Sequence, residues 1–358
     1  MKKCLLFLLS FFVVVTNSCH SGKENVRFPK NIVILIGDGM GSAQIYAAFT
    51  VNKGKLNIFR CPYTGFSKTY SASDYITDSA AGGTALSCGQ KTKNGCLGVD
   101  SLGHPFKSIL EYAEENGLST GLVSTSSVTH ATPASFIAHV LSRSMDENIA
   151  LDFLKTDVDV FIGGGKKFFV NRTDGKNLAD SLKKRKYHVL YNMKDIQRVT
   201  GGRLACFTAD EQNPKYSEGR GNMLPDAASR TLDILNKNPK GFFVMIEGSM
   251  IDWGCHANDA KYMIDETLDF DRTVGRVLDF ASKDGHTLVI VIADHETGGV
   301  TLQGGNIKEG TVNVKFSTEH HTGVMVPVYA FGPGAENFTG VYDNTAVFSK
   351  MKALYRFK

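Results

Sequence analysis

The sequence lacks the features that mark several protein classes. It has seven cysteines but no C-x-x-C pair, so we do not expect a zinc site built on thiolates. No stretch is basic enough to suggest a nucleic-acid surface, because the lysines are scattered along the chain. There is no internal repeat and no low-complexity tract. What remains is an ordinary globular composition over 358 residues, 42% hydrophobic and 21% charged with a formal charge of +4, long enough for a large core or two domains.

The N-terminal apolar run is too short for a normal membrane span. It covers Leu5 to Val15, follows Lys2 and Lys3, and gives way to small polar residues before Cys19. This order predicts an export signal over residues 1–18. Because the signal ends at a cysteine, it resembles a bacterial lipoprotein signal. We therefore expect an exported protein of the periplasm or cell envelope with a lipid anchor at Cys19; cleavage to a soluble periplasmic protein is the alternative.

The other cysteines leave the disulfide pattern open. Apart from Cys4 in the signal and Cys19 at its end, an odd number remains: Cys61, Cys88, Cys96, Cys206 and Cys255. Cys88 and Cys96 flank a loop rich in Gly and Lys, and they are the pair that an oxidising compartment could join. Spacing alone does not establish that bond.

Strand and helix patterns alternate along the chain. Apolar, β-branched runs end in short polar loops, and longer helical patterns lie between them. The runs are "NIVILIG", "STGLVSTS", "VDVFIGGG", "GFFVMIEG", "HTLVIVIADH" and "VPVYAFGPG". The alternation predicts a three-layer α/β/α sandwich around a central, largely parallel β-sheet. In such folds the active site lies outside the carboxyl ends of the strands.

Carboxylates and imidazoles recur at those predicted strand ends. They are Asp38, Glu247, Asp252, His256, Asp294, His295, His320 and His321, and Ser79 stands at a predicted helix start. Taken singly, an Asp after a strand is usually a helix cap, and a lone His is usually a structural hydrogen-bonding group. Together they would crowd like charges at one sheet edge, which bound cations would relieve. The donor types suit zinc and magnesium.

The turn "GDGMGS" after the first apolar run resembles the glycine-rich loop of a dinucleotide-binding site. Asp38 argues against that reading, because a phosphate on the helix N-terminus would meet its negative charge. A divalent cation on Asp38 would reverse the local field, so we expect the turn to approach phosphate through a metal. The other glycine run, Gly163 to Lys167, lacks the spacing of a phosphate-binding loop and is interpreted as a simple turn.

Six motifs, in order, resemble those of the alkaline phosphatases. They are "GDGMG", "TDSAAGGTA", "THATPASFIAHVLSR", "EGSMIDWGCHAND", "ADHETGG" and "HHTG". The resemblance runs from about Asn31 to Gly334. It implies one catalytic domain over residues 19–358 with few insertions, and hydrolysis of small phosphate monoesters through a phosphoserine. Dimers are common in the family, so a homodimer is an open expectation.

The resemblance also implies a ligand set. Asp252, His256 and His321 match the ligands of a first zinc, and Asp38, Asp294 and His295 those of a second. Asp38, Thr132 and Glu247 match the ligands of a third metal, usually magnesium. Ser79 matches the nucleophile and Arg143 the arginine that grips the substrate phosphate, while His320 is expected beside the site rather than on a metal.

Two positions depart from the best-known pattern of the family. His130 stands where that pattern has Asp, and Trp253 where it has Lys. Both would lie beside the substrate. A nitrogen donor near the third site could favour zinc or cobalt over magnesium. The indole of Trp253 removes a positive charge, so we expect weaker phosphate binding and easier product release.

Two other classes of function compete with this interpretation. One is a phosphodiesterase or sulfatase of the same superfamily. Phosphodiesterase relatives usually have Thr as the nucleophile and lack the arginine, whereas Ser79 and Arg143 are both present and no sulfatase-type Pro-Arg pattern follows. The other is an envelope lipoprotein that binds metal or phosphate without turnover, which would need the ligands but not Ser79.

Overall fold

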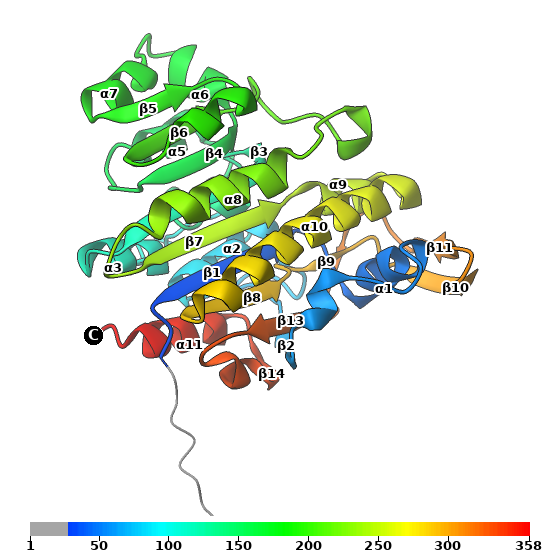
Figure 1. Ribbon diagram of the computed structural model, residues 1–358. Helices are drawn as coiled ribbons and strands as arrows, with labels where there is room; N and C mark the ends of the chain where they lie inside the picture. Colours follow the sequence, from blue (N-terminus) through cyan, green and yellow to red (C-terminus); the bar gives the residue numbers. More distant parts are fainter. Residues whose placement is uncertain (1–27) are drawn as a thin grey trace, which may run out of the picture.

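The computed structural model describes residues 28–358, so the predicted export signal and Cys19 lie outside the described residues. Ten strands form one mixed sheet in the order β14-β2-β13-β8-β1-β7-β3-β4-β6-β5 (Figure 1). Their bounds are β1 Asn31–Gly37, β2 Tyr63–Lys68, β3 Ser119–Ser127, β4 Val160–Gly164, β5 Tyr187–Leu190, β6 Arg203–Phe207, β7 Phe242–Gly248, β8 Thr287–Ile292, β13 Val326–Phe331 and β14 Gly340–Asp343. Two short two-stranded sheets pair β9 (Glu296–Thr297) with β12 (His321–Thr322) and β10 (Thr301–Asn306) with β11 (Thr311–Lys315).

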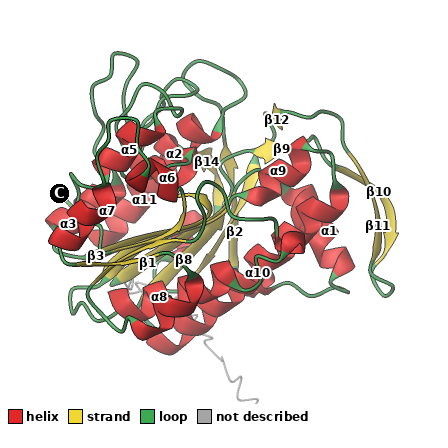
Figure 2. Ribbon diagram, turned by 90° about the horizontal axis from the view of Figure 1, so that it is seen from above, coloured by secondary structure: helices red, strands yellow, loops and turns green. Residues whose placement is uncertain are grey.

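Helices cover both faces of the sheet, with α8 and α10 on one face and α3, α7 and α11 on the other (Figure 2). The helices are α1 Ser42–Val51, α2 Ser79–Cys88, α3 Ile109–Glu115, α4 Ala131–Ala134, α5 Asp146–Asp152, α6 Lys166–Val170, α7 Leu178–Lys184, α8 Met223–Leu235, α9 Met250–His256, α10 Ala260–Asp284 and α11 Thr345–Tyr355. Short 3₁₀ helices are η1 Asn57–Arg60, η2 Met193–Arg198, η3 Tyr216–Glu218 and η4 Ala335–Phe338. The predicted three-layer α/β/α sandwich is confirmed. Within residues 28–358, no helix combines the length and apolar character needed to cross a bilayer.

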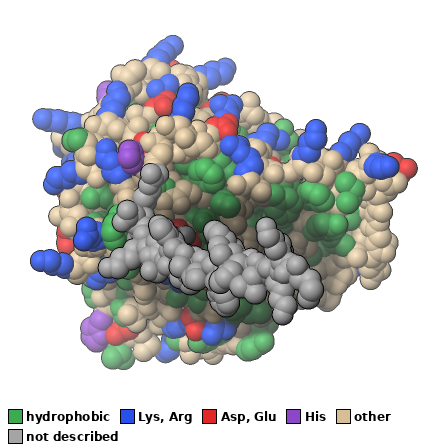
Figure 3. Space-filling model, turned by 60° about the horizontal axis from the view of Figure 1, so that its bottom comes forward, with side chains coloured by type: hydrophobic (Ala, Val, Ile, Leu, Met, Phe, Trp, Pro, Cys, Tyr) green, Lys and Arg blue, Asp and Glu red, His purple; other side chains and the backbone are tan. Residues whose placement is uncertain are grey.

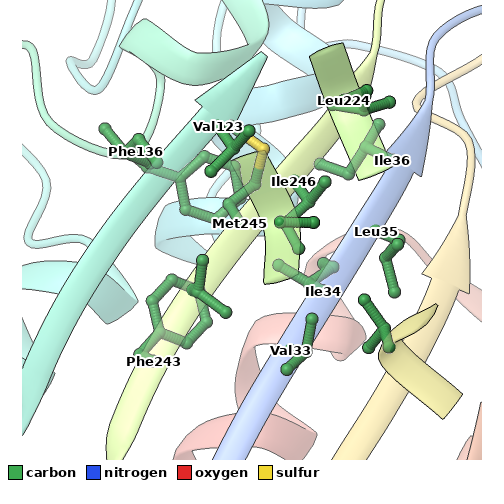
Figure 4. Packing of buried hydrophobic residues seen from close by; sticks show 14 of the residues in the cluster. Val33, Ile34, Leu35, Ile36, Val123, Phe136, Leu224, Phe243, Met245 and Ile246 are labelled. Atoms are coloured by element: carbon green, nitrogen blue, oxygen red, sulfur yellow. The ribbon is translucent and has the colours of Figure 1, made fainter. Parts of the chain in front are cut away.

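The core lies around the central strands β1 and β7. Residues 32–36 of β1 are fully buried, and Ile34 lies in register with Met245 of β7 and Ile290 of β8. Figure 4 shows the side chains of Ile34 and Met245 among the buried apolar residues of neighbouring strands. Because helices cover both faces, these strands read as unbroken apolar runs rather than alternating ones. Truncating one of these side chains, as in Ile34→Ala, should destabilise the fold by about 2–5 kcal/mol.

One strand of the sheet runs against the others. β13 is antiparallel to both of its neighbours, β8 and β2, while every other pairing in the ten-stranded sheet is parallel. The prediction of a largely parallel sheet therefore holds, with one exception. This reversed direction brings one predicted site residue into position. The amino end of β13 lies at the edge where the other strands end, and His321, five residues before β13, therefore lies at that edge.

The described cysteines are all buried and form no disulfide. Cys88 Sγ lies 3.3 Å from Ser87 Oγ, whereas Cys96 Sγ donates to the carbonyl of Leu141 at 3.4 Å. The two thiols thus have separate surroundings, and the suggested Cys88–Cys96 bond is not formed. Burial raises the pKa of the Cys88 thiol to about 12, so it stays protonated and unreactive.

Candidate metal centre and active site

The first group of donors joins α9 to β12. Asp252 and His256 lie one turn apart on α9, and His321 comes from β12. His256 Nε2 is 3.2 Å from Asp252 Oδ2 and 3.1 Å from His321 Nε2. These three side chains can place one ligand atom each around a common point.

The outer ring nitrogens of these histidines fix their tautomers. His256 Nδ1 donates to the carbonyl of Glu319 and His321 Nδ1 to that of Thr77, at 2.5 and 2.9 Å. With the protons on Nδ1, the two Nε2 lone pairs face one another and cannot hydrogen-bond. A cation between them resolves that conflict, and histidines that bind metals are typically held this way.

The second group lies at the ends of β1 and β8 and is fully enclosed. Asp38 and Asp294 follow these strands, and His295 Nε2 lies 3.4 Å from Asp38 Oδ1 and 3.2 Å from Asp294 Oδ2. All three side chains are at most 1% exposed. Gly39, in the turn, has a φ of +71°, and a Cβ there would lie 2.9 Å from the backbone of Asp252, so only glycine lets the two segments approach.

The third group shares Asp38 with the second and adds His130 and Glu247. Thr132 Oγ1 donates to Asp38 Oδ2 at 3.2 Å, which places the predicted threonine here as well. Two serines of β3, Ser124 and Ser126, hydrogen-bond one oxygen of Glu247, at 2.5 and 3.3 Å. The other oxygen faces the group.

Several atoms that face these groups have no hydrogen-bond partner among the described residues. They are Asp38 Oδ1, Asp294 Oδ2, Glu247 Oε1 and His130 Nδ1, each buried. A buried polar atom without a partner is strongly unfavourable, so orphaned acceptors at the ends of three separate strands, close to one point, require a positive charge nearby. The donors present therefore fit divalent cations.

Burial and mutual repulsion set the pKa values of these groups. Burial, together with the charge of Asp252, raises the pKa of Asp294 to about 8, and burial likewise raises the pKa values of Asp38 and Glu247. Burial, with Arg143 nearby, lowers the pKa of His130 to about 3. The imidazole stays neutral and can offer a lone pair, while the carboxylates need a cation to remain ionised together.

Ser79 is the first residue of α2 and lies beside the second group. The Asp78 side chain caps this helix by accepting from Ala81 N, and Ser79 Oγ lies 3.3 Å from His295 Nε2. A helix N-terminus carries partial positive charge, which favours an anionic oxygen at this position.

Arg143 contacts Asp78, the residue that caps α2 and directly precedes Ser79. Its Nη1 donates to Asp78 Oδ2 at 3.1 Å, and its Nη2 is 3.4 Å from His130 Nε2. The His130 ring packs edge-to-face against Trp253, with ring centroids 5.8 Å apart. The arginine, the imidazole and the indole thus contact one another in a row that begins at Asp78, the residue before Ser79.

This arrangement of donors, serine and arginine agrees with the comparison to known families. The model of the family described as alkaline phosphatase matches residues 29–314 and 307–357. The chain belongs to the alkaline phosphatase family. It is 35% identical to alkaline phosphatase 4 of Bacillus subtilis (strain 168), with 92% of this chain and 89% of the relative covered. It is 34% identical to the alkaline phosphatase of Escherichia coli (strain K12), with coverage of 90% and 85%.

Solved alkaline phosphatases share the fold. The enzyme from the Antarctic bacterium TAB5 has a TM-score of 0.89 and 42% identity, with 93% of this chain and 100% of that chain covered. A TAB5 mutant in which a histidine is replaced by glutamate has Mg bound in its M3 site. Alkaline phosphatases are metal-dependent, and the three donor groups are the candidate ligands in this chain.

The residues predicted from the sequence meet at one edge of the sheet. Asp38, Ser79, His130, Thr132, Arg143, Glu247, Asp252, Trp253, His256, Asp294, His295 and His321 all contact another member of this set or share a donor group with one. His320 is exposed, and its side chain makes no hydrogen bond within residues 28–358. Its backbone carbonyl instead accepts from Gly298 N.

Sequence reasoning missed the residues that hydrogen-bond the candidate ligands of this alkaline phosphatase. Thr297 Oγ1 donates to Asp252 Oδ1 and lies 3.1 Å from His295 Nδ1, so one hydroxyl contacts ligands of the first and second groups. Ser124 and Ser126 support Glu247. Their spacing of two in a strand, which puts both on one face, was the available signal.

Proposed function

We propose that this alkaline phosphatase hydrolyses phosphate monoesters through a phosphoserine on Ser79, with Arg143 holding the phosphate. One observation carries the proposal: a serine at a helix N-terminus lies 3.3 Å from a histidine of a buried donor group, with an arginine beside it. Metal and phosphate binding without turnover would not require that serine.

We assign two zinc ions and one magnesium ion to the donor groups. Asp252, His256 and His321 would hold the first zinc, and Asp38, Asp294 and His295 the second. Asp38, Glu247 and Thr132 would hold the magnesium, with His130 beside it. Bound there, such cations supply positive charge to the attacking and leaving oxygens of a phosphoryl transfer. The magnesium reported in a TAB5 mutant supports the third assignment.

The chain's own residues bind and orient the ester. The guanidinium of Arg143 is held by Asp78 through Nη1, which leaves N–H groups to donate to two phosphate oxygens. Ser79 Oγ attacks phosphorus, the P–O bond to the alcohol breaks, and the serine proton ends on the departing alcohol. Water then cleaves the phosphoserine, which releases inorganic phosphate and restores the hydroxyl.

The proposal is tested by a variant that lacks the attacking hydroxyl of Ser79. Ser79→Ala should lose most of the turnover of p-nitrophenyl phosphate, and acid-quenched wild-type enzyme should yield a phosphorylated peptide that contains Ser79. The exposed Ser282 of α10 gives a matched control, and Ser282→Ala should behave as wild type. Wild-type turnover by Ser79→Ala would overturn the proposal. A diester or a sulfate ester hydrolysed faster than the monoester would favour the rival members of the superfamily.

We further propose that residues 19–358 form one catalytic domain that is exported and held at the cell envelope by a lipid on Cys19. The apolar run before Cys19 supports export. Labelling with a radioactive fatty acid, lost in Cys19→Ser, tests the anchor. We also infer a homodimer, as is common in the family, which light scattering on the purified protein tests.

A further inference from the structure

Lysines that are scattered in the sequence gather at the edge of the sheet where the parallel strands begin. Exposed cations stand before β8, β1, β7 and β5 and at the chain end: Lys283, Lys30, Lys237, Lys240, Lys184, Arg185, Lys186, Arg356 and Lys358. Figure 3 shows Lys and Arg side chains along its left margin, the side on which β1 and β7 begin in Figure 1. We call this set the basic edge.

Both ends of the described chain lie at the basic edge. Tyr355, at the end of α11, accepts from Ile32 N at 2.8 Å and donates to the carbonyl of Phe242 at 2.5 Å, so the C-terminus lies at the starts of β1 and β7. The guanidinium of Arg356 stacks 4.7 Å over the ring of Phe28. Phe28, the first described residue, therefore lies at this edge.

The cations of the basic edge are not neutralised. Within residues 28–358 none of them has a carboxylate oxygen within 4.0 Å, whereas the neighbouring Arg203 is paired with Asp157 at 3.0 Å. The acidic groups near the edge without a cationic partner in the described chain are Glu114, Asp159, Asp284 and the terminal carboxylate of Lys358. Asp284 instead accepts from Thr287 Oγ1 at 2.6 Å. The edge keeps a net positive charge, while the carboxylates of the three donor groups lie at the opposite edge.

We propose that the basic edge is a docking face for a bilayer that contains anionic lipids. In the sheet order, β8 and β5 are six strand spacings apart, about 29 Å. The cations before these strands therefore form a row long enough to contact several lipid headgroups. Strands of five to seven residues separate this row from the metal centre by roughly 20 Å. The docked enzyme presents its active site away from the membrane, and Phe28, where the described chain begins, lies on the membrane side.

The expected affinity of the protein for an anionic bilayer depends on the number of cations at the basic edge. A cation close to an anionic bilayer strengthens partition about fivefold. Removing three of them should weaken it about a hundredfold. The attraction falls within a Debye length, so salt should release the protein. A nucleic acid or another soluble polyanion would need the same charges but no lipid, and the test separates these partners.

The experiment uses sedimentation of the full chain with vesicles of phosphatidylcholine alone and of phosphatidylcholine mixed with phosphatidylglycerol. The triple variant Lys184→Gln, Lys186→Gln and Lys240→Gln removes three of the nine cations of the basic edge. Its matched control, Lys55→Gln, Lys308→Gln and Lys315→Gln, neutralises three exposed lysines after α1 and around β11 that also have no carboxylate partner in the described chain. The N-terminal apolar run is common to all these proteins, and its contribution is read from pure phosphatidylcholine.

We expect the wild type and the control to bind the anionic vesicles, with release at high salt, and the edge variant to bind about a hundredfold more weakly. Both variants should hydrolyse p-nitrophenyl phosphate as the wild type does, bound or free, because none of these lysines lies at the metal centre. Equal binding by the two variants overturns the proposal. So does equal binding of the wild type to both kinds of vesicle, or binding to heparin without binding to vesicles.

Discussion

Replacing Thr297 with valine tests whether the ligands of the metal centre depend on the groups behind them. Thr297 is fully buried, and valine has nearly the same shape. The hydroxyl has one proton, which it donates to Asp252 Oδ1, so it must accept from His295 Nδ1 at 3.1 Å. The substitution removes both bonds and frees a ligand of the first group and a ligand of the second.

The magnitude follows from these two contacts. A hydrogen bond to a charged group contributes about 1.5–3 kcal/mol, and a buried donor left without a partner is penalised by about 1–3 kcal/mol. His295 is fully buried, so its Nδ1–H finds no water to replace the threonine. Losing an outer partner of a metal ligand typically weakens metal binding about 10- to 100-fold. We expect Thr297→Val to lower zinc affinity by that factor.

The assay is zinc titration against a competing chelator, with thermal unfolding in excess chelator as a second readout. Thr231→Val is the matched control, because Thr231 in α8 is also fully buried but its Oγ1 has no hydrogen-bond partner in the described chain. That variant should keep its zinc affinity and be as stable as the wild type or more so. Zinc affinity of Thr297→Val within twofold of the wild type would refute the reasoning.

Three further substitutions address the phosphate site and the pH dependence of stability. Trp253→Lys restores a positive charge and should tighten competitive inhibition by phosphate; unchanged or weaker inhibition contradicts this. Arg143→Ala should weaken phosphate inhibition about 10- to 100-fold while leaving the melting temperature nearly unchanged, and unaltered affinity would show that the guanidinium points elsewhere. Burial raises the pKa of Glu114 from 4.5 to about 7, so the folded chain holds a proton that the unfolded chain releases, and the free energy of unfolding falls between these pH values. Glu114→Gln should remove that fall and add about 2 kcal/mol above pH 7 after allowance for partial exposure, as measured by urea unfolding across pH; a pH profile identical to the wild type refutes it.

The sequence predicted the parts of the site that depend on strand ends. Asp38, Glu247 and Asp294 each directly follow or end an apolar run, and parallel strands bring such positions to one edge whatever their distance in the chain. The helical spacing of Asp252 and His256 was equally readable. The alternating strands and helices were enough to give the three layers.

Other parts depend on how the strands pair, which the alternation of strands and helices does not predict. The resemblance predicted His321, but the strand-end rule did not, because His321 precedes β13 and reaches the site only because β13 is antiparallel to β8. The bridging role of Thr297 depends on the pairing of β9 with β12 and on the approach of α9. The basic edge escaped notice because its lysines precede strands that are far apart in sequence, and only the sheet order aligns them.

The central claim is that buried carboxylates and imidazoles from separate strands are ligands of divalent cations. Anomalous scattering at the zinc edge, from a crystal grown with zinc, tests it most directly. We predict one peak among Asp252, His256 and His321 and a second among Asp38, Asp294 and His295, roughly 4 Å apart. Well-ordered side chains at these positions with no anomalous peak between them would contradict the account.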